Sequence, residues 1–319
     1  MFAERLCTLP AAFVTPVSAR RPAVPSIDGG TLVAPTRDMN SAALRMPTVE
    51  PPVNSRSALR ELFIRVSESC DLPPLPAVAV RAIALARDPN VGADQLVRVV
   101  STDAALAARV VSIARSVRYM RREAPRNLDG AIQTVGFQAL RRILIAASAR
   151  AAYRADDAVA QALWEHGLAT ALAADELSRL AGEPRGGNAF IAGLMHDVGR
   201  LVLHLADHVG YTALDREDEV REHETFGVTH GQVGACLAEH WGLEDDIVWA
   251  ILSHHRAPGD SKLARRIALA DRIAYWIGYG GTRDAEIVES IESDHQVAGF
   301  DEVAERVLQS FEIERALFA

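Results

Sequence analysis

The segment GLMHDVGR at residues 193–200 places a histidine and an aspartate side by side in an otherwise apolar stretch. Other imidazole and carboxylate residues are spaced around it, each in a segment with the apolar periodicity of a helix. Imidazoles and carboxylates that converge from several helices of one bundle can build a metal site in a helical core. We therefore interpret seven residues as candidate metal ligands: His166, His196, Asp197, His230, His254, His255 and Asp271.

Each of these residues alone has a simpler interpretation. A histidine in an apolar segment is more often a hydrogen-bonded core residue than a ligand. The pair His254–His255 could mark a helix end, where a cationic imidazole favours the negative end of the helix dipole. Five of the ten histidines belong to the ordered set, which favours the joint interpretation. We interpret the other five as solvated or capping residues: His204, His208, His223, His240 and His295.

The order of these residues resembles a known superfamily. From about residue 160 to 277 the chain is similar to the HD superfamily of metal-dependent phosphohydrolases, which carry His, His-Asp, His, often His-His, and Asp in that order. The segments 72–116, 193–205 and 230–255 are similar to the HDOD family, the HD-related output domain of bacterial signalling. The two resemblances together cover roughly residues 57 to 280.

The resemblance implies a ligand set and a chemistry. One metal ion would be held by four residues, His166, His196, Asp197 and Asp271. A second ion would share the same aspartate and use three histidines, His230, His254 and His255. Mixed nitrogen and oxygen ligands suit one or two divalent ions of Fe, Mn, Co, Ni or Zn. A metal pair would activate water for attack on phosphorus, with Asp197 and Arg200 as the candidate catalytic residues.

Three departures from the superfamily pattern limit the enzymatic interpretation. Arg200 stands where the catalytic branches usually carry lysine, and its planar guanidinium is not equivalent to the point charge of an ammonium. The stretch HHRAPGDSK at 254–262 lacks the Gly-Tyr-Pro signature of the HD-GYP phosphodiesterases, which disfavours hydrolysis of cyclic di-GMP. Ala162 stands where trinuclear members place a glutamate.

Three functions are therefore weighed. The first is a bacterial signalling output protein with a structural or ligand-sensing metal site, favoured by a long N-terminal half that a minimal hydrolase does not need. The second is a metal-dependent phosphohydrolase, favoured by the full ligand set. The third, a nucleic-acid binder, depends on an arginine cluster that we interpret instead as a solvated face with local ion pairs. This cluster comprises Arg115, Arg118, Arg121, Arg122, Arg126, Arg141 and Arg142.

The elements that must position the candidate ligands are all predicted to be helices. In the second half they span residues 159–180, 190–205, 225–240, 245–254 and 264–277. We expect an all-α fold in which a smaller helical subdomain, 57–152, precedes an HD-type bundle, 153–280. The proline-rich residues 1–56 are expected to form a disordered leader.

Residues 281–319 are expected to form a helical tail. The tail carries four apolar side chains on one predicted side, Val303, Val307, Leu308 and Phe311. This stripe could close the bundle or form a homodimer contact.

The composition limits which partners and which cellular compartment are expected. The 319 residues are 49% hydrophobic, enough for a large core, and carry a net charge of −8, which disfavours a general nucleic-acid binder. No uninterrupted apolar run approaches the ~20 residues that span a bilayer. The three cysteines lack CxxC spacing, as expected in a reducing cytoplasm. The expected partners are signalling proteins or a phosphate-containing ligand.

Overall fold

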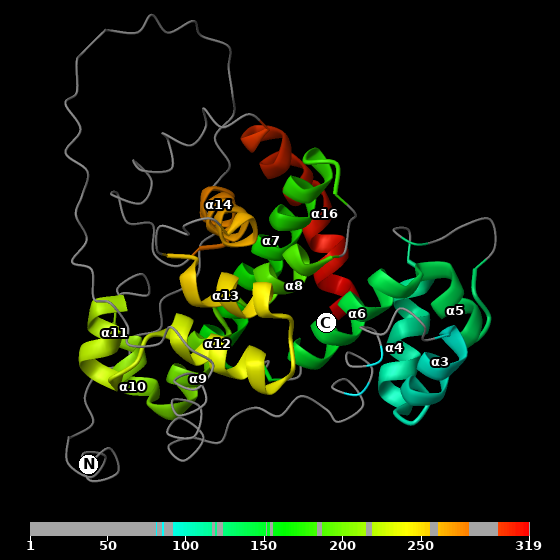
Figure 1. Cartoon of the computed structure of the whole chain (residues 1–319), viewed down its shortest axis with the longest axis horizontal. Coiled ribbons are helices and arrows are strands. Elements are labelled where there is room, and N and C mark those ends of the chain that lie inside the picture. The colour runs from blue at the N-terminus through cyan, green and yellow to red at the C-terminus, as the bar shows by residue number, and fades with distance from the viewer. Residues whose placement is uncertain are drawn as a thin grey trace, which may run out of the picture. The chain divides into compact units, whose positions relative to one another are not determined.

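The computed structural model describes most of the chain after residue 91. The described ranges are 92–116, 124–150, 156–183, 187–214, 219–255, 261–280 and 299–318, with residues 81, 85, 119, 152 and 153. Within these residues every regular element is an α-helix (Figure 1), which confirms the all-α fold. The predicted leader and the start of the predicted N-terminal subdomain lie outside the described residues.

Four helices form the described N-terminal part. They are α3 (Ala93–Val100), α4 (Ala104–Ala114), α5 (Leu128–Val135) and α6 (Phe137–Arg150). The carboxylate of Asp103 caps α4 by accepting a hydrogen bond from the Leu106 amide at 3.0 Å. Asn127 caps α5, and Gly136, with φ of 79°, separates α5 from α6 because only glycine adopts this conformation at little cost.

Nine further helices are described in the part that carries the candidate ligands. They are α7 (Ala158–Leu180), α8 (Asn188–Met195), α9 (Val198–Ala206), α10 (His208–Thr212), α11 (Glu219–Phe226), α12 (His230–His240), α13 (Asp245–Ser253), α14 (Lys262–Trp276) and α16 (Phe300–Phe318). The long helix α7 packs against α8, α14 and α16 (Figure 1). Its sequence is rich in alanine, which allows neighbouring helices to approach it on several sides.

The single helix predicted over 190–205 is wrong. The chain leaves the helix at His196 and Asp197 and resumes it at Val198, so α8 and α9 are separate. Asp197 has φ of −102° and ψ of 11°, outside the helical region. Neighbouring side chains on one helix diverge by about 100°. The turn removes this constraint, because both residues then reach the same part of the interior.

The helix predicted over 225–240 is also divided. Helix α11 ends at Phe226, and Gly227 reverses the chain with φ of 74°. Thr229 then starts α12 with a capping box, in which its hydroxyl and the side chain of Gln232 each bond the other's backbone N–H. His230 is consequently the first residue of α12, at a defined position in space.

Two members of the arginine cluster differ from the prediction of a solvated face. Arg141 and Arg142, on α6, are buried, with exposed fractions of 5% and 3%. Arg141 donates to Asn188 Oδ1 at 3.1 Å and pairs with Glu244 at the start of α13. The sequence could not show this because burial depends on where α6 docks. Arg115 and Arg126 are exposed as predicted, and the remaining three members lie outside the described residues: Arg118, Arg121 and Arg122.

Arg142 joins α6 to the bundle. Its guanidinium pairs with Asp175 of α7 at 3.4 Å and donates to the hydroxyl of Tyr119. It also lies 4.6 Å from the ring centroid of Phe190 on α8, a cation–π arrangement. Asp175 is 2% exposed, so this ion pair belongs to the core rather than to a solvated face.

Helix α16 closes the bundle by packing along α7 (Figure 1). Val303, Val307 and Phe311 are buried as predicted, at 0%, 0% and 1% exposure. Leu308 is 43% exposed, so its place on the buried stripe was predicted wrongly. The helical period explains the difference, because Ala304 fills the inward position one residue after Val303. A homodimer contact through this tail stays a prediction.

One stretch of the described chain is long and apolar enough by length and mean hydropathy to cross a membrane, although His196, Asp197 and Arg200 interrupt it. It spans Asn188–Ala206, with a mean hydropathy of 1.3, and 89% of it is buried inside the protein. It comprises α8, α9 and the turn between them. We interpret it as part of the core, because a central helix pair satisfies the same length and hydropathy criteria.

Candidate metal centre

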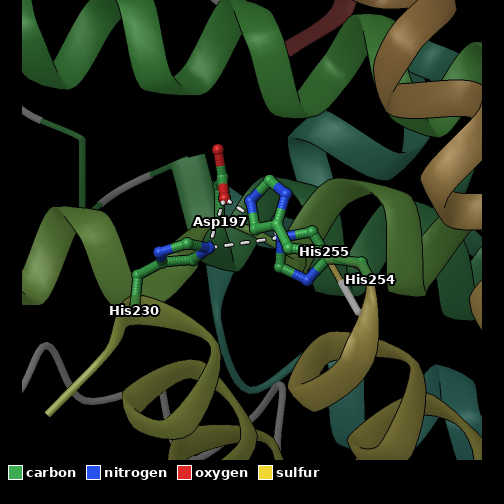
Figure 2. Close-up of side chains that lie close together, drawn as sticks. All are labelled: Asp197, His230, His254 and His255. Atoms are coloured by element: carbon green, nitrogen blue, oxygen red, sulfur yellow. Dashed lines mark hydrogen bonds and ion pairs between the residues drawn. The ribbon is translucent and has the colours of Figure 1, made fainter. Parts of the chain in front are cut away.

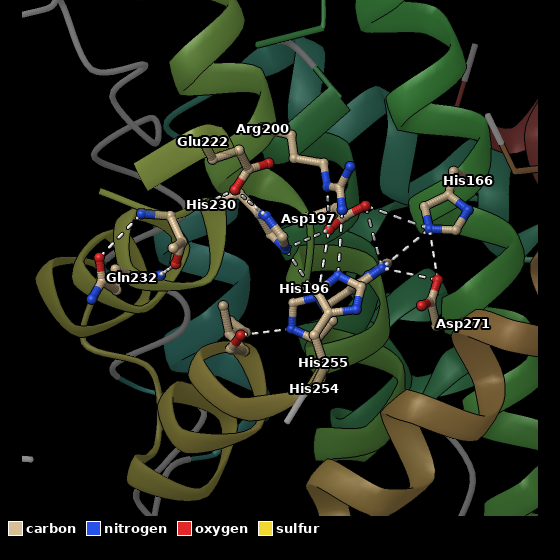
Figure 3. Close-up of polar contacts among 12 residues, drawn as sticks. His166, His196, Asp197, Arg200, Glu222, His230, Gln232, His254, His255 and Asp271 are labelled. Atoms are coloured by element: carbon tan, nitrogen blue, oxygen red, sulfur yellow. Dashed lines mark hydrogen bonds and ion pairs between the residues drawn. The ribbon is translucent and has the colours of Figure 1, made fainter. Parts of the chain in front are cut away.

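All seven candidate ligands converge on one region of the helical core (Figure 3). They come from the middle of α7 (His166), the α8–α9 turn (His196, Asp197), the start of α12 (His230), the end of α13 (His254, His255) and α14 (Asp271). Six of the seven are buried, with exposed fractions between 0% and 6%. His255 is partly buried.

The first half of the centre brings together two imidazoles and two carboxylates. His166 Nε2 lies 3.2 Å from His196 Nε2. Asp271 Oδ1 lies 2.9 Å from His166 Nε2 and 3.5 Å from His196 Nε2. Asp197 Oδ2 lies 3.5 Å and 3.6 Å from the same two nitrogens. Four ligand atoms from two helices and one turn therefore face one another.

The second half gathers histidines around the other oxygen of Asp197 (Figure 2). Asp197 Oδ1 lies 3.5 Å from His230 Nε2 and 3.6 Å from His254 Nε2, and the two nitrogens are 3.3 Å apart. His255 packs against this pair, with its ring tilted by 45° to that of His254 and the two centroids 4.1 Å apart. The carboxylate of Asp197 thus divides its two oxygens between the two halves.

Four of the imidazoles are oriented by a contact of Nδ1, on the side of the ring that faces away from the centre. Each Nδ1 lies 2.7 Å from an oxygen: Tyr279 O for His166, Gly193 O for His196, Ile251 O for His254 and Glu222 Oε2 for His230. A carbonyl oxygen only accepts, so the Nδ1 facing it carries the proton. The Nε2 atoms are thereby aimed at the centre, in the arrangement that orients histidine ligands around metals.

The geometry fits a cation between the Nε2 atoms. With Nδ1 protonated, two neutral imidazoles would present Nε2 lone pairs to each other at 3.2 Å, which is unfavourable. Asp271 Oδ1 is buried, and its approach to His166 lacks the geometry of a hydrogen bond. A buried carboxylate oxygen without a hydrogen bond is costly unless a cation compensates it. A proton or a metal ion in the first half removes the repulsion between the two Nε2 lone pairs and also compensates the charge of Asp271 Oδ1.

The electrostatics keep the carboxylates ionised. Burial opposes ionisation, yet Arg200 and the neighbouring histidines hold the pKa of Asp197 well below its usual value. The pKa of Asp271 is likewise held well below its usual value, because His166 and His196 outweigh its desolvation. Although burial disfavours the charged imidazole, Asp271 raises the pKa of His166.

In the second half, the pKa values of two histidines are lowered rather than raised. Burial, with the nearby charge of Arg200, lowers the pKa of His230 well below its usual value. Burial and the adjacent His254 do the same to the pKa of His255. Both imidazoles are therefore neutral, which is the protonation state that a metal ligand needs.

Close helix contacts bring the ligand-bearing segments together. A Cβ on Gly167 of α7 would lie 2.9 Å from Leu194 O, and one on Gly193 would lie 2.9 Å from Ala171 Cα. A Cβ on Gly199 of α9 would overlap the carbonyl oxygen of His230. Glycine is therefore required where α7 meets α8 and where α9 meets α12. The sequence analysis missed this role, although each of these glycines lies within three residues of a candidate ligand.

The anchoring residues were also missed. Glu222 of α11 is fully buried, and its Oε2 accepts hydrogen bonds from both the backbone N–H and Nδ1 of His230, at 2.8 Å and 2.7 Å. Burial raises the pKa of Glu222 to about 7. Tyr279 anchors His166 through its carbonyl, while its ring stacks on Phe311 of α16 with centroids 3.8 Å apart. Nothing in the local sequence marks either residue.

A second group of possible ligands lies outside this centre. His204 was interpreted as solvated or capping, but it is buried, and its Nε2 lies 2.7 Å from Asp157 Oδ2 and 3.2 Å from His208 Nδ1. Asp157 is the N-cap of α7, so His204 supports a helix cap. His204 Nδ1 has no hydrogen-bond partner among the described residues, in contrast to the four anchored imidazoles. We therefore interpret this group as structural.

The remaining predicted non-ligands follow the prediction where the structure describes them. His208, His223 and His240 are exposed, and His295 lies outside the described residues.

A comparison with known protein families assigns the chain to one of them. Residues 72–257, more than half of the chain, match the HDOD domain. The chain belongs to the HDOD family. The resemblance expected from the sequence is thereby confirmed at the level of the family.

Known proteins share the fold of this HDOD protein. An HDOD domain protein of unknown function from Geobacter sulfurreducens has a TM-score of 0.63 at 23% identity, covering 80% of this chain and 90% of its own. A proposed signal transduction protein from Marinobacter aquaeolei VT8 has a TM-score of 0.60 at 25% identity, covering 82% and 66%.

A curated relative is longer than this chain. It is an uncharacterized protein of Treponema pallidum (strain Nichols), 25% identical over 196 residues, which are 59% of this chain and 38% of the relative. The chain therefore matches less than half the length of that relative.

Proposed function

We propose that this HDOD protein is a regulatory protein of bacterial signal transduction whose helical core holds a divalent transition metal. The metal would have a structural or ligand-sensing role. The ligands would be drawn from the seven residues of the centre. Mixed imidazole and carboxylate ligation suits Fe, Mn, Co, Ni or Zn.

One observation carries this proposal. Four imidazoles are held by Nδ1 contacts of 2.7 Å with their Nε2 atoms converging on buried, ionised carboxylates. Histidines that serve only packing have no reason to share this orientation. Outer contacts of this kind are typical of metal ligands, whose ring direction and tautomer they fix.

The burial of the centre favours regulation over turnover. Asp197 and Asp271 are each 6% exposed, and His196 and His230 are fully buried. A substrate would have to reach these atoms, whereas a structural or sensing ion needs no such access. The similarity to a proposed signal transduction protein from Marinobacter aquaeolei VT8 supports the same conclusion.

A metal-dependent phosphohydrolase is the second candidate. The division of the Asp197 oxygens between two ligand groups favours it, since a shared carboxylate suits a two-metal site. When bound, metal ions supply Lewis acidity and lower the pKa of water. The metal-loaded protein should then hydrolyse bis-p-nitrophenyl phosphate faster than its Asp197→Asn variant. Equal rates for the two proteins would reject this candidate.

The proposed metal site is tested by metal content. The protein would be purified without an affinity metal and analysed by mass spectrometry, before and after reloading with Mn²⁺ or Fe²⁺. We expect at least one transition-metal ion per chain in the wild type. The ion should be lost in His196→Ala and retained in His240→Ala, because His240 is an exposed histidine of α12.

A second readout does not depend on counting ions. An ion that binds only the folded protein raises its melting temperature, and the rise grows with the ratio of free ion concentration to Kd. We expect Mn²⁺ to raise the melting temperature of the wild type and of His240→Ala but not of His196→Ala. A wild type that retains no metal and shows no such shift would reject the metal site and leave these histidines as core residues.

A further inference from the structure

The side chain of Arg200 lies inside the second half of the centre (Figure 3). It projects from the first turn of α9 and is 1% exposed. Its Nε donates to Asp197 Oδ1 at 3.0 Å, and a terminal nitrogen lies 3.3 Å from His255 Nε2. Arginine can only donate, so His255 Nε2 accepts this contact.

The two contacts of Arg200 occupy two of the four possible ligand atoms around Asp197 Oδ1. Asp197 Oδ1 and His255 Nε2 both accept from Arg200. The other two possible ligand atoms are Nε2 of His230 and Nε2 of His254, which lie 3.3 Å apart. Two imidazoles beside a guanidinium make a poor site for a divalent cation, because the two positive charges would repel each other in a buried place of low polarity.

The first half lacks such an internal cation. In the described part of the chain, the ion pairs of His166, His196 and Asp271 are formed with one another and with Asp197. It also has one more carboxylate than the second half. The two halves therefore differ in charge, and a divalent ion is favoured in the half that has no arginine.

We infer that the guanidinium of Arg200 takes the place of a second metal ion, so that the centre binds a single ion. The ion would be held by His166, His196, Asp197 Oδ2 and Asp271. His255 would serve as an acceptor for Arg200 rather than as a ligand. This inference rests on the proposed metal site and adds its stoichiometry and the cause of it.

The number of ions per chain tests this inference. The full-length protein would be stripped with a chelator, reloaded with excess Mn²⁺ and freed of unbound metal. We expect one ion per chain in the wild type, and an electron paramagnetic resonance spectrum of isolated Mn²⁺ rather than of an exchange-coupled pair. Two ions per wild-type chain with a coupled spectrum would overturn the inference while leaving the proposed metal site intact. No ion at all would overturn both.

Variants identify Arg200 as the cause. Arg200→Met removes the charge with little change in length, and we expect it to bind a second ion and to show the coupled spectrum. His255→Ala should bind one ion, because His255 is an acceptor for Arg200 rather than a ligand. A folded Arg200→Met protein that still binds one ion, or a His255→Ala protein that binds none, would overturn the inference. The wild-type stoichiometry decides the question if Arg200→Met does not fold.

Discussion

Four histidines in the core have the same tautomer for the same reason. An acceptor oxygen 2.7 Å from each Nδ1 leaves Nε2 as the atom that faces the carboxylates. The sequence could predict the seven ligand candidates, because their types and order stand out within apolar helices. It could not predict the anchors, because three of the four are backbone carbonyls, which any residue supplies.

At the scale of single residues, Asp271 gives a testable prediction about metal affinity. Its Oδ1 is buried and lies 2.9 Å from His166 Nε2. Asp271→Asn replaces an ionised ligand by a neutral amide of the same shape, so we expect the affinity for Mn²⁺ to fall at least ~10-fold. Competition with a fluorescent chelator measures this. Asp301→Asn, at an exposed position of α16, is the matched control and should bind as the wild type does.

At the scale of elements, the centre depends on how closely helices meet. The α7–α8 and α9–α12 contacts are lined by glycines, which bring His166 towards His196 and Asp197 towards His230. Periodicity in the sequence predicted the helical segments that carry the candidate ligands, but not α10 or most of α11. It did not predict the turn at His196–Asp197, because the chain there keeps an apolar pattern across the break.

Gly199→Ala tests the α9–α12 contact. The new Cβ would overlap His230 O and lie 2.8 Å from the Gly234 amide nitrogen, so the two helices must move apart. We expect the free energy of unfolding to fall by about 3 kcal/mol, at the upper end for overpacking. Gly231→Ala is the comparison, because its nearest neighbour would be Leu252 O at 3.3 Å. Its change should stay within about 1 kcal/mol, since the gain in helix propensity offsets a small strain. Equal losses in urea unfolding would contradict this ranking.

Glu183 connects the end of α7 to α14 and predicts a dependence on pH. Its carboxylate pairs with Arg266 and Lys262, each at 2.6 Å, and these hydrogen bonds lower the pKa of Glu183 to about 2. A carboxyl whose pKa is lowered on folding stabilises the protein above the unfolded pKa of ~4.3, and this contribution is lost as the pH falls towards about 2.

The variant Glu183→Gln should therefore differ from the wild type in a pH-dependent way. We expect it to be less stable by at most about 1 kcal/mol at pH 6, because the pair is partly solvated. This difference should shrink as the pH is lowered from about 4.5 to about 3. Urea unfolding at several pH values measures it. A difference that does not change with pH would show that the ion pair contributes nothing. Glu305→Gln, at an exposed position of α16, is the control for replacing a surface glutamate.

At the scale of the whole molecule, α6 connects the described N-terminal helices to the bundle. Arg142 is central to this contact, because it meets Asp175 of α7 and the ring of Phe190 on α8. The sequence showed these arginines as part of a basic cluster. Their burial depends on long-range docking, which local periodicity does not contain, and this is why a solvated face was predicted.

A double-mutant cycle tests this contact. Arg142→Met should cost about 3 kcal/mol of unfolding free energy, because the carboxylate of Asp175 loses a buried ion-pair partner. Adding Asp175→Asn should recover at least about 1 kcal/mol, since no charge then remains to be compensated. Denaturant unfolding of the four proteins gives the coupling energy. Strictly additive losses would show that the two side chains act independently.

Tyr279 takes part in two contacts, one through its backbone and one through its ring. Its carbonyl fixes the ring of His166, and its own ring stacks on Phe311 of α16. The position of the C-terminal helix and the direction of a candidate ligand are therefore set by the same residue. Thermodynamic linkage makes such a connection reciprocal. If a partner protein shifts α16 and thereby changes the affinity for the ion by some factor, the ion changes the affinity for that partner by the same factor.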